Sequence, residues 1–141
     1  LNNNNETKRF VRNSLKFLIK SPIDINFDFN SDDYCLLPVT IVICNPSFTD
    51  SVSFLLETMK PDESVRSNYF WAGCTKQTVK NLKPQQEIEI VLTAGFFTPG
   101  VYNVNKFKFL VYSPDSTSKD GKLIICPFQH LVKVNQISSK Q

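Results

Sequence analysis

The chain has 141 residues, which is enough for one domain with its own hydrophobic core. Its 16 lysines and arginines stand against 13 aspartates and glutamates, and the resulting charge of +3 lies well below the concentrated positive charge of nucleic-acid-binding domains. No apolar run approaches the roughly 20 residues that span a bilayer. Twelve phenylalanines against one methionine and four glycines favour strands over helices.

The first residues differ in composition from the rest of the chain. Residues 1–14 begin with a leucine and four asparagines, a low-complexity run that indicates a linker or disordered lead-in within a longer protein. Within residues 8–20, basic side chains recur at every fourth position, as in an amphipathic helix that lies on an anionic membrane. Residues 15–20 also have the pattern of a strand. We favour the strand, because the later pattern is β throughout.

Alternation of apolar and polar side chains marks the next strands. Residues 23–29 alternate with a period of two, which predicts a strand with one face in water. Residues 36–44 are almost entirely apolar, as expected of a central strand, and Pro38 near its start is tolerated there. A turn at Asn45-Pro46 leads into a returning strand over residues 52–57.

Short apolar segments separated by turn signals continue toward the C-terminus. The pattern predicts an all-β fold, an immunoglobulin-like antiparallel β-sandwich of about seven to nine strands over residues 15–135. A polar tail follows at residues 136–141. We expect the last strand to bend at Pro127. The segments expected to form the later strands are residues 69–73, 88–92, 101–104, 107–112, and 123–126 continued by 131–134.

The four cysteines contain no CxxC pair that would indicate a zinc or redox site. Three of them lie in apolar runs, where a free cysteine packs as a small hydrophobe. We favour free thiols over disulfides, and therefore an intracellular protein. The alternative is an extracellular adhesion-type β-sandwich, which would need disulfides. The cysteines are Cys35, Cys44, Cys74 and Cys126.

Residues able to carry out catalysis are few and scattered. His130 is the single histidine, which leaves no multi-histidine metal site. A Cys74–His130 dyad has no supporting motif, and Glu87 and Glu89 share a solvated strand face. We therefore predict no catalytic, cofactor-binding or metal-binding residue, no cofactor, no small-molecule substrate and no nucleic-acid partner.

One tryptophan and its aromatic neighbours are expected to fill the core. Trp71 is predicted to anchor the core between two sheets, since one ring buries up to about 250 Å². We expect Tyr102 and Phe97 to join it there.

Two stretches of sequence carry a family resemblance. The first is Tyr69-x-Trp71-x-Gly73 followed by Leu82-Lys83-Pro84-Gln85 and the strand at 88–93, and the second runs from Gly95 to Val104. Together they resemble the C-terminal β-sandwich of subunit 8 of the transport protein particle (TRAPP), a membrane-tethering complex. Related domains occur in other large TRAPP subunits.

The resemblance implies a non-enzymatic scaffold in ER–Golgi and autophagy membrane traffic. Its partners would be other subunits of a multiprotein tethering complex. Its location would be cytoplasmic and peripheral to Golgi- and ER-derived membranes. No catalytic residue is transferred by the resemblance.

A basic stretch near the N-terminus is the candidate interaction site. Each basic group near anionic lipid contributes about 1 kcal/mol of binding, so the stretch could make a peripheral contact with an anionic membrane or with a protein partner. The alternative is a solvated strand or linker. The stretch comprises Lys8, Arg9, Arg12, Lys16 and Lys20.

Overall fold

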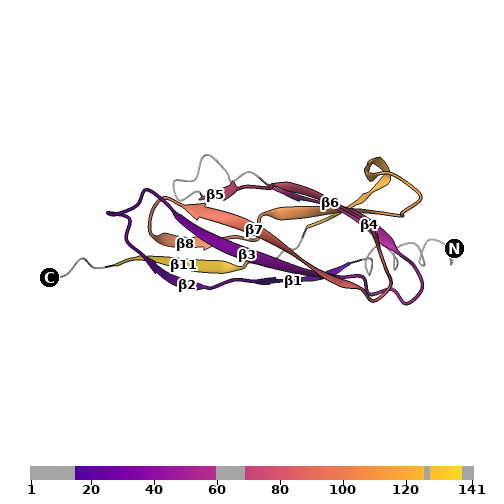
Figure 1. Ribbon diagram of the computed structural model, residues 1–141, viewed down its shortest axis with the longest axis horizontal. Helices are drawn as coiled ribbons and strands as arrows, with labels where there is room; N and C mark the ends of the chain where they lie inside the picture. Colours follow the sequence, from indigo (N-terminus) through magenta and orange to yellow (C-terminus); the bar gives the residue numbers. More distant parts are fainter. Residues whose placement is uncertain (1–14, 60–68, 126–127, 138–141) are drawn as a thin grey trace.

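The computed structural model describes residues 15–59, 69–125 and 128–137, and within them the chain forms strands and one short 3-10 helix (Figure 1). This confirms the all-β fold. The strands are β1 (Lys16–Lys20), β2 (Asp24–Phe27), β3 (Cys35–Cys44), β4 (Val52–Thr58), β5 (Tyr69–Ala72), β6 (Lys76–Leu82), β7 (Glu87–Phe96), β8 (Gly100–Asn103), β9 (Phe107–Tyr112), β10 (Lys122–Ile124) and β11 (Leu131–Gln136), and the helix is Ser118–Asp120.

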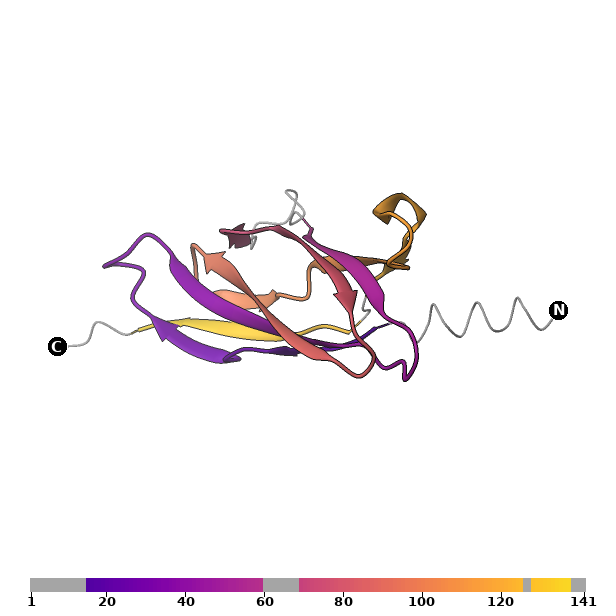
Figure 2. The same ribbon diagram turned by 45° about the vertical axis from the view of Figure 1, so that its right-hand side comes forward.

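Three sheets make up two layers. The first sheet has the order β1-β3-β7-β5 and is antiparallel throughout. The second sheet (β10-β9-β4-β6) and the third sheet (β2-β11-β8) share buried contacts with one face of β3 and β7, so together they form the opposite layer. In Figure 2 the yellow β11 lies toward the C-terminal end of the molecule and the magenta β4 toward the N-terminal end.

The chain changes layers between β1 and β2. β1 pairs with β3 up to Lys20↔Thr40, and β2 then pairs in parallel with β11, from Asp24↔Lys133 onward. Between β8 and β9 the chain passes from the third sheet to the second within the opposite layer. As a result, β3 has only β7 as a paired neighbour over residues 35–39, among the strands that the structure describes.

Two hydrophobic clusters lie between the layers. The cluster between the first and second sheets contains Phe54 and Phe109, both 0% exposed. The cluster between the first and third sheets contains Phe96 and Tyr102. Alternate residues of β3 and β7 point into these clusters, which explains why both strands are central and strongly apolar.

Of the three aromatic side chains expected in the core, only Tyr102 is fully buried, and its hydroxyl donates a hydrogen bond to the Thr98 carbonyl at 2.6 Å. Trp71 lies on the edge strand β5, where it is partly buried against both clusters. The prediction for Phe97 was wrong, since its side chain is 55% exposed. The alternation of β7 turns Phe96 inward, so its neighbour must point outward.

The C-terminal part also differs from expectation. Residues 123–126 and 131–134 were expected to form one bent strand, but β10 pairs with β9 in the second sheet and β11 pairs with β8 and β2 in the third. Pro127 and residues 1–14 lie outside the described residues. The described strands run from Lys16 to Gln136.

Candidate functional site

The basic stretch is described only in part. Lys16 and Lys20 lie on β1 with their side chains exposed, while Phe17 and Ile19 between them pack against the buried clusters. The alternative of a helix is therefore wrong for these residues, because exposed and partly buried side chains alternate along β1 with the period of two that a strand has. The other three basic residues, Lys8, Arg9 and Arg12, lie outside the described residues.

The structure does not bring Cys74 and His130 together. Cys74 is exposed, and its thiol contacts the Lys76 carbonyl at 3.1 Å. His130 Nε2 lies 2.8 Å from the Ser21 hydroxyl instead. Cys35, Cys44 and Cys74 are all free thiols, as favoured from the sequence, while Cys126 lies outside the described residues.

His130 links the third sheet to the segment between β1 and β2, and burial lowers its pKa below the ordinary value of 6.5. The unfolded chain therefore takes up a proton more readily than the folded one as the pH falls through 6.5. We predict that the stability conferred by the folded structure around neutral His130 is fully present above pH 6.5 and is lost as the pH falls below this value. Urea unfolding of wild type and His130→Gln at about pH 7.5 and about pH 5 measures it. A pH dependence that is the same in both proteins would contradict this assignment.

Within residues 15–59, 69–125 and 128–137, no three His, Cys, Asp or Glu side chains lie close enough together to hold a metal ion. The same residues contain no helix that is long and apolar enough to cross a membrane.

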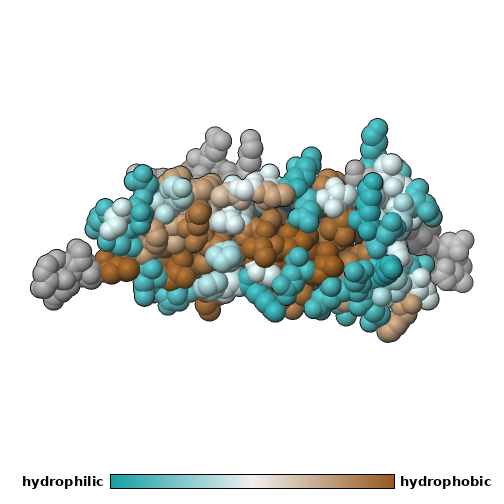
Figure 3. Space-filling model, in the orientation of Figure 1, coloured by the Kyte–Doolittle hydropathy of each residue, from teal (hydrophilic) through white to brown (hydrophobic). Residues whose placement is uncertain are grey.

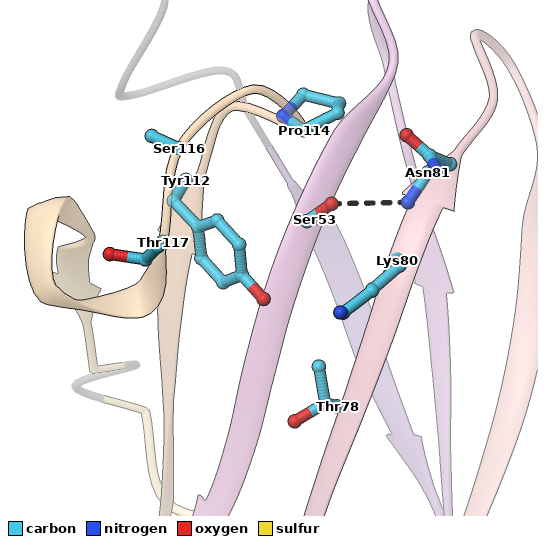
Figure 4. Close-up of a pocket in the computed structure, with 8 residues that line it drawn as sticks. All are labelled: Ser53, Thr78, Lys80, Asn81, Tyr112, Pro114, Ser116 and Thr117. Atoms are coloured by element: carbon cyan, nitrogen blue, oxygen red, sulfur yellow. Dashed lines mark hydrogen bonds between the residues drawn. The ribbon is translucent and has the colours of Figure 1, made fainter.

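A polar hollow of about 320 Å³ lies beside β4, β6 and β9, under the segment that follows β9 (Figure 4). The Ser53 hydroxyl accepts a hydrogen bond from the Asn81 N–H at 3.1 Å, and Asn81, with a φ of 59°, is one of two β6 residues opposite Ser53 where the register of the β4–β6 pair shifts. The Tyr112 hydroxyl and the Lys80 side chain point into the hollow. The lining residues are Ser53, Thr78, Lys80, Asn81, Tyr112, Pro114, Ser116 and Thr117.

The hollow offers hydrogen bonds but no acid–base pair. Its lining contains no carboxylate, imidazole or thiol. A neighbouring hollow shares Asn81 and Pro114 and is lined by Asp50 and Asp115, whose charges oppose that of Lys80. An anion would gain little in such surroundings.

The outer face of the first sheet presents a larger feature, an apolar surface at the end where β3 begins. The register aligns Leu36, Gly95 and Phe70 in one row across β3, β7 and β5, with Pro38 and Thr93 in the next row. Figure 3 shows an apolar band along the middle of the molecule, where Figure 1 places β3 and β7. We call this surface the apolar face; it consists of Tyr34, Leu36, Pro38, Phe70, Val91 and Phe97.

Three aromatic rings form one end of the apolar face. The ring centroids of Phe70 and Phe97 lie 4.9 Å apart, and that of Tyr34 lies 5.7 Å from Phe70 in an edge-on arrangement. Tyr34 is 47% and Phe97 55% exposed. Exposed aromatic groups that support one another in this way are typical of protein interfaces.

Gly95 holds the central ring in place. It lies opposite Phe70 in the β5–β7 pair, and a side chain added at this position would overlap the Phe70 ring. Glycine is needed here because of the close approach of the ring. The ring therefore lies directly on the backbone of β7, which fixes the shape of the apolar face.

Charged groups lie at both ends of this sheet face. Two carboxylates directly precede Tyr34, and two more extend from the start of β7 at the far end. Two ammonium groups lie along β1. The structure gives none of these six groups an ion-pair partner within the described part of the chain. They are Asp32, Asp33, Glu87, Glu89, Lys16 and Lys20.

The two layers, the antiparallel pairing and the clusters between the sheets make this chain an immunoglobulin-like β-sandwich. A family model described as the TPPC8 C-terminal Ig-like domain matches residues 14–113, and the chain belongs to this family. The resemblance drawn from residues 69–104 is thereby confirmed.

A human relative supports the same family. The chain is 30% identical over 94 residues to trafficking protein particle complex subunit 8 of Homo sapiens, a match that covers 64% of this chain and 6% of that protein. The chain thus spans a small part of the length of this relative.

Two solved structures have a weak likeness. One is a FixG-related protein from Vibrio parahaemolyticus, with a TM-score of 0.41 and 10% identity over 86% of this chain and 96% of that one. The other is a β-glucosidase from Listeria innocua, with a TM-score of 0.32 and 14% identity over 86% of this chain and 16% of that one.

The sequence patterns did not point to the apolar face, although one signal was present. The inward series of Ile88, Ile90 and Leu92 falls on even positions, and its continuation puts Phe96 inside and Phe97 outside. Phe97 lies beside Tyr34 and Phe70 because of the strand order, and periodicity does not reveal strand order.

Proposed function

We propose that this chain is a non-enzymatic scaffold and interaction domain of a large subunit of a TRAPP-like vesicle-tethering complex. It would act in ER–Golgi and autophagy traffic, on the cytoplasmic side of Golgi- and ER-derived membranes. Its partners would be other subunits of the complex, and the basic stretch would add a peripheral contact with anionic membrane.

The family match carries this proposal. It concerns a domain of a trafficking-complex subunit, and the relative's name states membership of a particle with several subunits. The uncovered apolar face supports a binding role, because a solvent-exposed group of aromatic rings is a feature of interaction surfaces. The polar hollow beside β4, β6 and β9 has no carboxylate, imidazole or thiol in its described lining, so it offers no acid–base pair.

Affinity capture from cell extract with residues 1–141 as bait, read by mass spectrometry, tests the proposal. We expect recovery of other tethering-complex subunits. A parallel bait carries Arg9→Glu and Arg12→Glu, and liposome co-sedimentation of both baits measures the membrane contact. Charge reversal should weaken sedimentation with anionic vesicles, since each basic group contributes about 1 kcal/mol.

The outcome separates the two parts of the proposal. A folded bait that recovers no subunit of such a complex contradicts the scaffold role. Unchanged sedimentation after charge reversal leaves the scaffold role intact but removes the membrane contact.

A further inference from the structure

We propose that the apolar face binds an amphipathic helix of a partner subunit, with lysines or arginines flanking the apolar side of that helix. This inference rests on the proposed scaffold function and gives it a surface and a kind of partner.

The dimensions of the apolar face suit one helix. It crosses three strands, β3, β7 and β5, which at about 4.8 Å spacing give a width of roughly 10 Å, close to the diameter of a helix. Along β3 it extends from Tyr34 to the row of Thr40 and Val91, a length of about 20 Å. A helix of about 14 residues covers that length. Helices stacked on the apolar face of a sheet are a common layer arrangement.

The edge of β3 favours a helix on the face over a strand added beside it. Residues 35–39 have no described strand on the side away from β7, so an extended segment could in principle pair there. Pro38 lies in the middle of this segment and has no N–H to donate. A proline on an edge strand is a common protection against strand addition. The exposed rings of Tyr34 and Phe97 remain available to a partner that lies across the face.

The charges indicate a basic partner. The two ends of the sheet face carry four carboxylates with no ion-pair partner among the described residues, against two ammonium groups along β1, in a chain whose overall charge is +3. Asp32 and Asp33 lie directly beside Tyr34, at the aromatic end. Lysines or arginines at the ends of the helix would meet these carboxylates, which sets orientation and association rate. An anionic membrane would meet like charge at these four carboxylates.

A pair of designed helical peptides tests the proposal. Both have about 16 residues and one leucine stripe, and they differ in flanking residues, which are lysine in one and glutamate in the other. We measure binding to the 141-residue chain by fluorescence anisotropy at low and high salt. The lysine peptide should bind at least about tenfold more tightly than the glutamate peptide, and its advantage should shrink with salt.

Substitutions on the chain test whether the lysine peptide binds at the apolar face. Tyr34→Ser combined with Phe97→Ser should weaken binding of the lysine peptide by at least about tenfold, because a few aromatic anchors supply most of the affinity of an interface. Both side chains are half exposed, so the variant should retain its unfolding midpoint. Phe48→Ser is the matched control: Phe48 is 84% exposed beyond the other end of β3, and its loss should leave binding unchanged.

Three results would overturn the proposal: no binding of either peptide, equal loss in the control, or loss of self-association or vesicle binding in the double variant. A second capture from cell extract distinguishes this failure from failure of the proposed function. If the double variant recovers the same subunits as wild type, the scaffold role stands and the helix site is wrong. If wild type recovers no subunits, the scaffold role itself fails.

Discussion

Replacing Phe109 by alanine will lower the free energy of unfolding by about 3–5 kcal/mol. The ring is 0% exposed and lies between the first and second sheets. Its centroid is 4.8 Å from that of Phe17 and 5.6 Å from that of Phe54, so truncation leaves a cavity bordered by rings from β1 and β4. Urea unfolding at 25 °C, followed by circular dichroism, measures the loss.

Phe48→Ala is the control for this prediction. The same chemical change at a side chain that is 84% exposed should alter the stability by less than about 0.5 kcal/mol. Similar losses in both variants would mean that the cluster around Phe109 is not the dry core that the contacts indicate.

The second large effect is expected at Asn45, which closes the turn between β3 and β4. Its side chain is 1% exposed, its Nδ2 donates to the carbonyls of Asp50 and Leu82 at 2.8 and 2.9 Å, and its Oδ1 accepts from the Ser47 N–H. Asn45→Asp removes both donated bonds and places a carboxylate against two carbonyl oxygens. We expect a loss of about 3 kcal/mol or more at neutral pH, measured by thermal and urea unfolding.

Asn30→Asp provides the matched change in a different environment. Asn30 is exposed, and the structure shows a hydrogen bond to its backbone N–H but none to its side chain. The substitution should cost less than about 1 kcal/mol. A comparable loss at both positions would show that added negative charge, and not the buried hydrogen bonds of Asn45, determines the effect.

Periodicity was sufficient to predict the central strands. Residues 36–44 are mostly apolar on both faces: the inner face packs into the clusters between the layers, and the outer face runs from Leu36, which is 50% exposed, to Val42, which is 7% exposed. The alternation in β7 also predicts which side faces the core. These features follow from side-chain pattern alone, since successive residues of a strand point to opposite faces.

The same side-chain pattern does not predict strand order. β10 and β11 both look like short apolar strands, yet they belong to different sheets, and only their partners β9 and β8 decide this. Trp71 was expected deep between the sheets, but β5 is an edge strand, so its ring is only partly covered. The apolar face was missed for the same reason, because it combines side chains from β3, β5 and β7 with Tyr34 and Phe97 beyond the strand ends.

Hydroxyl-radical footprinting of the free chain and of the complex captured from cell extract shows whether a partner covers the apolar face. Oxidation of Tyr34 and Phe97 reports on the apolar face, while Phe48 and Phe128, which are 84% and 77% exposed, serve as references in the same sample. We expect oxidation of Tyr34 and Phe97 to fall severalfold in the complex while that of Phe48 is unchanged. Equal oxidation of Tyr34 and Phe97 in both samples, with complex subunits present, would contradict it.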